Sequence, residues 1–352
     1  MKILYIGQYS KGTTSHMRAE EIKKILSPDH FYVIDTHFPF YNTPRIWRTL
    51  GFRYKRGPLV SNTNRYCLTE LEEMETSAKF DLVWVDKGIF LTPNLMKNLK
   101  ARSKKIIHYT PDMAFYENKS VHFKKSIPFY DFLITTKRAE IPVYTEHIPK
   151  EKIILTTQGF SKDVHYSKLP FEKKDNSVAF IGLAEKSRFE IIELLLQNNI
   201  KVRVAGMGWN KFANKHKENP NLDYVGSGIF SHEYSEFLSS SKFALGLLSK
   251  NFPEFHTTRT FEIPACGTAL LTEKNIETSS FFSEDEAIFY SSPDELVEKI
   301  QFYLQNEKQL ETLIQKGLDR VHNDARDYES LLSQILQRAL PPLGIKNHKE
   351  NN

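Results

Sequence analysis

The feature that most constrains the fold is a regular alternation of short, β-rich apolar runs with helical segments. In the first half of the chain, strands are expected at Lys2–Gly7, His30–Asp35, Phe80–Val85, Lys105–Tyr109, Phe129–Thr135 and Lys152–Thr156. Helical periodicity predicts helices over 20–26, 68–78 and 92–100, between these strands. Strands that alternate with helices form a parallel sheet with right-handed crossovers, so the first half is predicted to be α/β.

A polar segment, residues 166–177, interrupts this pattern and is expected to be a linker. Strands then recur at Val178–Gly182, Lys201–Ala205, Asp223–Val225, Phe243–Leu248 and Thr268–Thr272. The helices expected after the linker are 190–198, 233–240, 259–266, 293–306, 307–321 and 328–340. We therefore predict two α/β domains, 1–168 and 169–326, followed by a C-terminal segment, 327–352, whose polar end is expected to be disordered.

Composition indicates a globular protein of a reducing compartment. The chain has 352 residues, and no apolar run approaches the ~18 residues that span a bilayer. Its first residues lack the apolar stretch of a signal peptide. Cys67 and Cys266 are the only cysteines, which argues against a disulfide scaffold or a cysteine-rich zinc site. We expect a cytoplasmic location, with peripheral contact at the inner membrane face as an extension of it.

The membrane alternative comes from residues 45–66, the basic-aromatic segment. No Asp or Glu occurs from Thr36 to Thr69, although the whole chain has a net charge of only +5. The segment interleaves basic with aromatic side chains: Arg45, Trp47, Arg48, Phe52, Arg53, Tyr54, Lys55, Arg56, Arg65 and Tyr66. Such a segment is either a solvated surface or a patch for an anionic partner, namely phospholipid, a lipid-linked phosphate or an acidic glycan. Nucleic acid is the weaker option, because no nucleic-acid-binding motif accompanies the patch.

Several familiar motifs are absent or incomplete. The sequences Gly206-Met-Gly208 and Gly226-Ser-Gly228 are half-motifs of a dinucleotide fingerprint. Gly7 and Gly12 have P-loop spacing, but Thr13 stands where the lysine should be. No Asp-x-Asp pair occurs, which argues against glycosyltransferases that bind a diphosphate through a metal ion. We therefore expect no metal and no cofactor.

The second half carries the most informative polar residues. Glu254 and Glu262 are separated by the spacing Glu-x7-Glu, and Glu262 opens a short helix that leads into a buried strand. A carboxylate there would face the ligand-binding edge of a parallel sheet and could accept two adjacent hydroxyls, such as a ribose diol. Arg259 could neutralise a diphosphate or simply pair with Glu262 one helical turn away.

Other polar residues of this half have an equally open role. Lys186 and Arg188 follow the strand that ends at Gly182, and they are candidates for the diphosphate or ordinary charges of an exposed turn. His256, Thr257 and Thr258 could donate to a sugar or a phosphate, or could be turn residues.

The first half offers candidates for the acceptor side. Asp112 follows a predicted strand and is a candidate general base for an acceptor hydroxyl, unless it only caps a turn. Gly7, Gly12 and His16 lie at or after the tip of the first strand, and Arg48 and Arg53 belong to the basic-aromatic segment. These five residues are the predicted acceptor-binding set.

The chain from about 178 to 336 resembles the glycosyltransferase domain of the spore-maturation CgeB-like family, a GT-B group. The stretches that carry the resemblance are Phe180-Ile-Gly182, Ala205-Gly-Met-Gly-Trp209, Arg259-Thr-Phe-Glu-Ile-Pro-Ala-Cys-Gly267 and Ile288-Phe-Tyr-Ser-Ser-Pro-Asp-Glu-Leu296. The first half is similar more loosely, through 81–88 and 129–136. The resemblance implies two Rossmann-like parallel-sheet domains facing a central cleft, with the last helix crossing back to the first domain.

The resemblance also implies roles for individual residues. Glu262 would hold the nucleotide ribose, Glu254 would lie near the donor sugar, and the base would stack near the turn 226–230. The predicted donor-binding set is Glu262, Arg259, Arg188, Lys186, Thr258, Gly182 and Gly228, and the predicted catalytic pair is Asp112 and Glu254. The residues 255–261 depart from the Gly-Phe-Gly-Leu-Pro that many Glu-x7-Glu enzymes have, which leaves the sugar and the stereochemistry open.

The sequence thus predicts a metal-independent glycosyltransferase. It would move a sugar from a UDP-, GDP- or dTDP-activated donor to a hydroxyl of a glycan or lipid-linked acceptor, with no nucleic-acid partner. Two alternatives remain: a nucleotide-sugar epimerase of the same fold, and a non-catalytic homologue that binds a nucleotide sugar.

Overall fold

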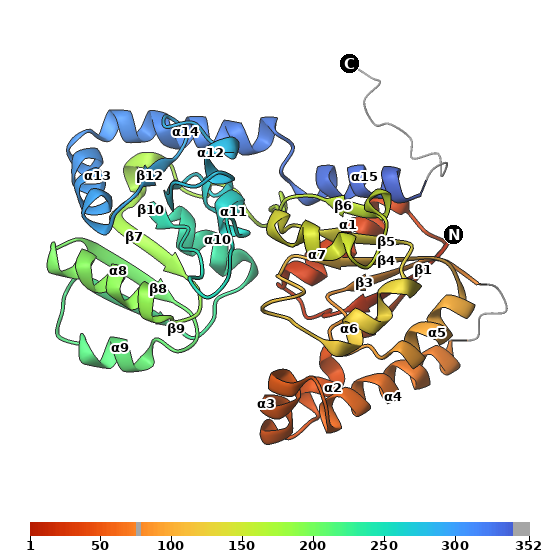
Figure 1. Cartoon of the computed structure of the whole chain (residues 1–352). Coiled ribbons are helices and arrows are strands. Elements are labelled where there is room, and N and C mark those ends of the chain that lie inside the picture. The colour runs from red at the N-terminus through yellow and green to blue at the C-terminus, as the bar shows by residue number, and fades with distance from the viewer. Residues whose placement is uncertain (75–78, 341–352) are drawn as a thin grey trace, which may run out of the picture. The chain divides into compact units, whose positions relative to one another are not determined.

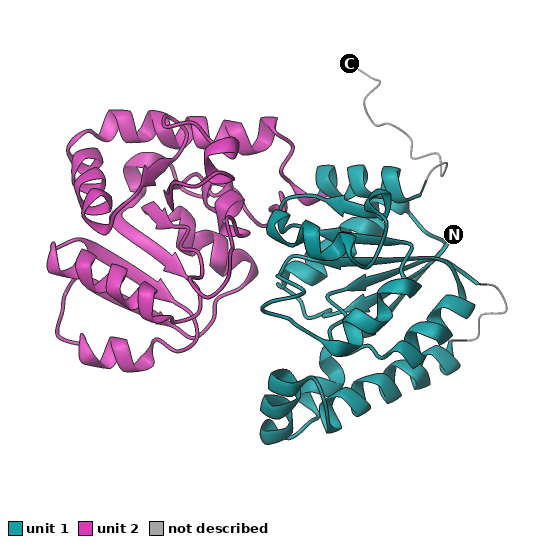
Figure 2. Ribbon diagram, viewed as in Figure 1, with its two compact units in different colours: residues 1–157, 329–352 teal, residues 158–328 magenta. Residues whose placement is uncertain are grey.

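The computed structural model describes residues 1–74 and 79–340. Two compact units divide the chain: unit 1 comprises residues 1–157 and the chain from 329 onward, and unit 2 comprises residues 158–328 (Figure 2). The domain boundary therefore precedes the expected linker, 166–177. That segment instead contains the 3-10 helix η4 (Phe171–Lys173) and the start of strand β7 (Asp175–Ile181). The first two residues of β7 are exposed, which explains why the segment is polar.

Unit 1 is built on a six-stranded parallel sheet with the order β2-β1-β3-β4-β5-β6. Its strands are β1 (Lys2–Gly7), β2 (His30–Asp35), β3 (Phe80–Asp86), β4 (Ser103–Thr110), β5 (Phe132–Thr135) and β6 (Ile153–Leu155). Its helices are α1 (Thr14–Leu26), α2 (His37–Tyr41), α3 (Arg45–Tyr54), α4 (Pro58–Glu73), α5 (Pro93–Ala101), α6 (Val121–Ser126), α7 (Ile141–Thr145) and α15 (Tyr328–Ala339), with 3-10 helices η1 (Ile127–Phe129), η2 (Arg138–Glu140) and η3 (Lys150–Lys152).

Unit 2 repeats the architecture with the strand order β12-β11-β10-β7-β8-β9, again all parallel. Its strands are β7 (Asp175–Ile181), β8 (Lys201–Ala205), β9 (Leu222–Gly226), β10 (Ser241–Leu245), β11 (Ala269–Glu273) and β12 (Ile288–Tyr290). Its helices are α8 (Lys186–Gln197), α9 (Asn210–Lys215), α10 (Ser231–Ser239), α11 (Arg259–Ala265), α12 (Thr278–Phe281), α13 (Pro293–Gln305) and α14 (Glu307–Asn323). Apolar clusters cover both faces of the sheet, so the buried parts of its inner strands are apolar, whereas residues of the edge strand β9 are in part exposed.

The expected strands are present, and the main differences concern helices. Helix α1 begins at Thr14 because the Thr13 hydroxyl accepts the amide hydrogen of His16. Helix α4 spans Pro58–Glu73 rather than 68–78, since Pro58 is suited to a helix start; residues 75–78 lie outside the described part of the chain. The short elements α2, α6, α7, α9, α12 and β12 carry too few periods to be recognised in the sequence.

The chain passes between the units twice. Within unit 2 the two passing segments lie side by side, because Phe160 donates to the Arg326 carbonyl and Tyr328 donates to the Phe160 carbonyl. Helix α15 then belongs to unit 1, where the Arg338 guanidinium donates to the Ile153 carbonyl at 3.2 Å. Among the described residues, no helix has both the length and the apolar character needed to cross a membrane.

Candidate functional site

The sheet topology of unit 2 defines where a ligand would bind. Strands β7 and β10 are neighbours, and the chain proceeds from them in opposite directions along the sheet. The carboxyl ends of such a strand pair form the ligand-binding crevice of open α/β sheets. Gly182 follows β7 and Leu247 follows β10, so the residues near these two positions are the first to examine.

Glu262 lies on α11 and is only 3% exposed. Its Oε2 accepts a hydrogen bond of 2.6 Å from the Tyr234 hydroxyl of α10, and its Oε1 lies 3.7 Å from His165 Nε2. Burial and the neighbouring carboxylate raise the pKa of Tyr234 well above its usual value, so the phenol remains a donor. The Glu262 carboxylate is therefore a fixed acceptor at the start of a helix.

His165 supports this carboxylate as a neutral ring. Its Nδ1 accepts the amide hydrogen of Ser161 at 3.0 Å, which leaves the proton on Nε2, the nitrogen that faces Glu262. Burial lowers the pKa of His165, and the Glu262 charge only partly opposes this effect. The contact with Glu262 is thus one between a carboxylate and a neutral imidazole N–H.

Arg259 does not form the ion pair with Glu262 that was the alternative to a diphosphate-binding role. Its guanidinium donates instead to the Leu247 carbonyl at 3.3 Å, at the end of β10. Its Nε is buried and has no hydrogen-bond partner within the described residues, and the same is true of the Thr257 hydroxyl oxygen. Buried polar atoms are nearly always satisfied, so two unsatisfied ones at the start of α11 make this a candidate place for a polar ligand.

Arg188 and Lys186 have different surroundings although they share the first turn of α8. Arg188 is buried; its guanidinium donates to the Leu183 carbonyl at 2.9 Å and lies 3.2 Å from Glu185. It also lines a pocket of about 650 Å³ at the ends of β10, β11 and β12. Lys186 is exposed and lies 3.9 Å from Glu190. Arg188 is therefore the better placed cation of the two.

The glycines of unit 2 shape the strand ends. A Cβ on Gly206 (φ +140°) would lie 2.0 Å from the Gly182 carbonyl oxygen, so only glycine fits this close approach. Gly228 belongs to the turn between β9 and α10, next to the exposed Phe230. Helix α10 carries Tyr234, so this turn leads directly to the Glu262 site.

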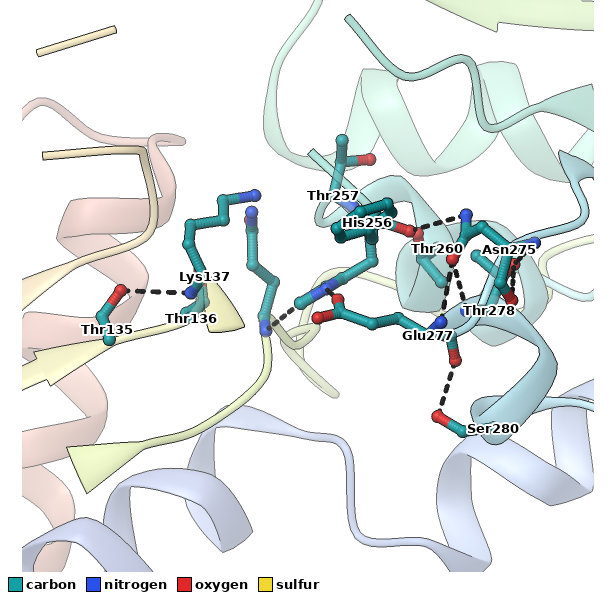
Figure 3. A network of polar contacts seen from close by, with 12 residues as sticks. Thr135, Thr136, Lys137, His256, Thr257, Thr260, Asn275, Glu277, Thr278 and Ser280 are labelled. Atoms are coloured by element: carbon teal, nitrogen blue, oxygen red, sulfur yellow. Dashed lines mark hydrogen bonds and ion pairs between the residues drawn. The ribbon is translucent and has the colours of Figure 1, made fainter. Parts of the chain in front are cut away.

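Glu254 and His256 lie in the connection from β10 to α11. Glu254 is half-buried, and its amide donates to the Phe252 carbonyl. His256 is buried; its Nε2 accepts the amide hydrogen of Gln158, and its Nδ1 lies 2.5 Å from Glu277 (Figure 3). Asn275 in turn accepts from the amides of Glu277 and Thr278. His256 thus has a structural role in holding its loop, and Thr258 begins α11 without a side-chain cap.

The carboxyl edge of the unit 1 sheet holds a second polar cluster. Asp112, just after β4, is paired with Lys87, just after β3, with a distance of 2.5 Å between Oδ2 and Nζ. Partial burial would raise the pKa of Asp112, but the Lys87 charge and hydrogen bond, helped by Lys137 and Arg18, lower it. Lys87 has φ +65°, a left-handed backbone that costs a lysine about 1 kcal/mol. Asp112 is thus an ionised carboxylate held in place, rather than a turn cap.

A buried ion pair lies beneath this cluster. Arg18 Nε donates to Asp86 Oδ2 at 2.9 Å and Arg18 NH2 to Oδ1 at 3.0 Å, with both side chains buried. The guanidinium also lies 4.6 Å from the ring centre of Tyr109. This bidentate geometry fixes the ends of β3 and β4, from which Lys87 and Asp112 project.

Two histidines belong to the same edge, His108, which is buried, and His37, which is partly buried. His108 Nε2 donates to the Lys87 carbonyl at 2.9 Å, and burial lowers the pKa of His108 to about 4. Burial also lowers the pKa of His37. The Nδ1 atoms of both rings are buried and lack a hydrogen-bond partner among the residues described. Both imidazoles are therefore neutral near pH 7.

The structure separates the predicted acceptor residues into three groups. Gly7 is a packing position, because a Cβ there would lie 2.8 Å from Asp86 Cβ. Gly12 (φ +86°) turns the chain before α1, where the His16 ring lies 4.8 Å from Tyr9. Arg48 lies over the Phe40 ring at 5.0 Å, whereas Arg53 is exposed.

Sequence reasoning missed Lys87, Tyr234 and His165. Lys87 had a usable signal, since it follows the apolar run of β3 directly, as Asp112 follows β4. Tyr234 and His165 had none, because tertiary packing alone brings them to Glu262. Within 1–74 and 79–340, no group of three His, Cys, Asp or Glu side chains could hold a metal ion.

Comparison with known proteins gives a partial family match. Residues 188–337 match a family model described as glycosyl transferase-like, a stretch that includes Arg188, Arg259 and Glu262. This description is broader than the CgeB-like family. No curated protein matches the chain.

Solved structures resemble nearly the whole chain. Anabaena HepE in complex with UDP-glucose is 13% identical, with a TM-score of 0.65 over 96% of this chain and 98% of that one. Sucrose-phosphate synthase from Thermosynechococcus elongatus is 12% identical, with a TM-score of 0.65 over 96% and 98%. A UDP-N-acetylglucosamine 2-epimerase is 12% identical, with a TM-score of 0.54 over 92% and 94%. At such identities the likeness shows the fold, which is the two-domain α/β GT-B fold.

Proposed function

We propose that this GT-B chain is a glycosyltransferase that uses a nucleotide-diphosphate sugar and needs no metal ion. The observation that carries the proposal is the polar group at the start of α11: the fixed Glu262 carboxylate, the unsatisfied Arg259 Nε and the unsatisfied Thr257 hydroxyl. The glycosyl transferase-like match over 188–337 includes all three residues. HepE, which shares the fold, was solved with UDP-glucose.

The proposed donor site combines a carboxylate for the ribose with two arginines for the diphosphate. Glu262 would accept the two ribose hydroxyls, because a carboxylate has about four acceptor positions and Tyr234 occupies one of them. With so little of Glu262 exposed, Tyr234 or His165 must shift for both hydroxyls to reach it. Arg259 and Arg188 would neutralise the diphosphate, and exposed Phe230 would stack on the base. Glu254 would contact the sugar.

The proposed acceptor side is the Lys87–Asp112 pair of unit 1. Asp112 would take the proton of the acceptor hydroxyl while that oxygen bonds to the anomeric carbon. The bond from the anomeric carbon to the diphosphate oxygen breaks, and the nucleoside diphosphate leaves with the electron pair. Lys87 keeps Asp112 ionised and oriented before the reaction.

Two other functions are compatible with the fold. An epimerase would convert the donor alone, and an epimerase is among the structural neighbours. A non-catalytic homologue would bind the nucleotide sugar without releasing nucleotide. Product analysis after incubation with donor alone, and then with donor and acceptor, separates these functions from sugar transfer.

The test is a thermal-shift series with UDP, GDP, dTDP, CMP and NAD, each with and without EDTA. One diphosphate nucleotide should raise the melting temperature, with no effect of EDTA. Glu262→Ala should abolish this shift. Tyr234→Phe is the matched control, since it removes the hydroxyl that Glu262 holds but leaves the carboxylate in place. Stabilisation by NAD alone, or an unchanged shift in Glu262→Ala, refutes the proposed donor site.

A further inference from the structure

Helix α3 turns its most apolar side away from the protein. Ile46, Leu50 and Tyr54 recur at intervals of one turn and therefore share a face, with Trp47 beside them. Ile46 is 64% exposed, Trp47 44% and Tyr54 59%. An amphipathic helix of a globular protein normally buries its apolar face, whereas α3 exposes it to solvent.

The opposite side of α3 attaches it to unit 1. Gly51 packs so closely on α4 that a Cβ would lie 2.7 Å from Leu59 Cβ. The Phe52 ring meets Phe40 and Phe90 edge-on, with centroids 5.6 and 5.0 Å away. Because these contacts hold the helix, the exposed apolar face is not needed for folding.

Helix α2 also carries exposed aromatic side chains. Helix α2 adds Phe38 and Tyr41, which are both more than half exposed. Helices α2 and α3 both pack against α4, and α3 lies away from the strands of unit 1 (Figure 1). Phe52 is itself 40% exposed at the border of this region. We call seven of the other exposed side chains of these two helices the α2–α3 surface: Phe38, Tyr41, Arg45, Ile46, Trp47, Arg53 and Tyr54.

The charged side chains that α2, α3 and the turn after them contribute are basic, and the carboxylate of Glu117, from another part of unit 1, lies near Lys55. Arg45 and Arg53 are exposed on α3, Arg56 is exposed just after it, and no Asp or Glu occurs from Thr36 to Thr69. A second copy of this surface would bring arginines against arginines, which argues against self-association. Nucleic acid would not need exposed Ile46. Arginines bordering aliphatic and aromatic side chains suit a bilayer interface that contains anionic lipid.

We propose that the α2–α3 surface binds the interface of an anionic phospholipid bilayer. Ile46, Trp47 and Tyr54 enter the boundary between headgroups and acyl chains, and Arg45 and Arg53 contact lipid phosphates. This docking is independent of the proposed sugar transfer and needs no spanning helix. It would hold the chain at a membrane by many weak contacts.

Tryptophan fluorescence provides a direct readout. The chain has 3 tryptophans. Trp84 and Trp209 are buried, whereas Trp47 is exposed. Vesicles of phosphatidylcholine with phosphatidylglycerol should shift the emission to shorter wavelength, and vesicles of phosphatidylcholine alone should not. Trp47→Phe should lose the shift but still float with the anionic vesicles.

Flotation of the full chain with the same vesicles tests the electrostatic and the apolar components of membrane binding. Arg45→Gln and Arg53→Gln should each weaken binding about fivefold, and added salt should weaken the wild type. Ile46→Ser with Tyr54→Ser should abolish flotation. The matched controls lie in unit 2: Ile276→Ser and Phe302→Ser are exposed apolar positions, and Lys217→Gln is an exposed basic one. None of the three should change binding.

Several outcomes would overturn the proposal. They are absence of flotation in the wild type, equal binding to both kinds of vesicle, equal loss in the control variants, and sedimentation of a wild-type dimer that the Ile46 and Tyr54 variants abolish without any vesicle binding. Binding of a single-stranded oligonucleotide in preference to anionic vesicles would also overturn it. The arginine variants leave the apolar face intact, so they remain informative if the serine variant fails to fold.

Discussion

Lys87 and Asp112 form the residue pair on which the proposed chemistry depends most. Lys87 adopts a left-handed backbone, and such positions persist where the surrounding structure holds them, often at functional sites. Its amide donates to the Tyr109 carbonyl at 2.8 Å, which fixes the end of β3 against β4. The strained position therefore directs an ammonium at a carboxylate across two neighbouring strands.

Removing the Lys87 charge should change the pH dependence of catalysis. In Lys87→Met, burial is no longer offset by the ammonium, so the pKa of Asp112 should rise. The acid limb of the kcat profile should move to higher pH.

Asp112→Asn should lower kcat about 100- to 10,000-fold, the usual loss for a general base. An unmoved acid limb, together with an active Asp112→Asn enzyme, would exclude Asp112 as the base.

His108 should make folding sensitive to acid. Its pKa falls from 6.5 to about 4 in the folded protein, so the unfolded chain binds the additional proton between these values. His108 therefore does not lower the free energy of unfolding above pH 6.5. As the pH falls toward 4, protonation of the unfolded chain at this residue lowers the free energy of unfolding by roughly 3 kcal/mol in total.

The variant His108→Gln tests this acid sensitivity. Glutamine keeps a donor for the Lys87 carbonyl but does not titrate in this range. Urea unfolding at several pH values should give a shallower loss of stability than in the wild type. Equal slopes in both proteins would contradict a buried neutral His108.

At the scale of elements, strand ends decide where the functional groups lie. Gly206 directly follows β8 with φ +140°, and Gly226 is the last residue of β9 with φ +133°. The two backbones are alike, but their surroundings differ: the Gly182 backbone fills the space beside Gly206, and nothing lies within 4 Å of a Cβ on Gly226. The close approach of β8 to β7 therefore sets the shape of the crevice edge.

These two glycines form a matched pair for mutation. Gly206→Ala should lower the free energy of unfolding by more than about 3 kcal/mol, because backbone strain adds to a clash with backbone atoms. Gly226→Ala should show only the strain, about 1–2 kcal/mol. Chemical unfolding measures both, and equal losses would mean that the close packing beside Gly206 is unimportant.

At the scale of the whole molecule, each unit has its own sheet and its own core. Helix α15 follows all of unit 2 in the sequence but belongs to unit 1, where it contacts Ile153. Unit 1 is therefore complete only after α15 has been made. The two units should differ in which mutations destabilise them.

Two leucines test this division. Leu336 in α15 and Leu310 in α14 are both fully buried, and replacing either by alanine should cost about 2–5 kcal/mol. Leu336→Ala should speed hydrogen exchange of the amides in β5 and β6, and Leu310→Ala should do so in β10 and β11. Each variant is the control for the other. Uniform acceleration throughout the chain would show that the units unfold together.

The sequence alone determined the α/β class and the strands of both sheets except β12, and it predicted Glu262 as the leading ligand-binding carboxylate. These follow from local patterns, since a strand buried on both faces is a continuous apolar run. Residue patterns also suggested Asp112 as the candidate general base, because polar residues directly after such apolar runs lie at the sheet edge where ligands bind. The basic-aromatic segment was visible as a stretch without carboxylates.

Only the tertiary structure decided what each of these residues contacts. It paired Asp112 with Lys87, brought Tyr234 and His165 to Glu262, and turned Arg259 toward Leu247 instead of Glu262. It also showed that Arg48 packs on Phe40 while Trp47 faces solvent, although both lie in one short helix. The physical reason is that sequence spacing fixes which residues share an element, whereas packing between elements far apart in the chain fixes partners, burial and charge state.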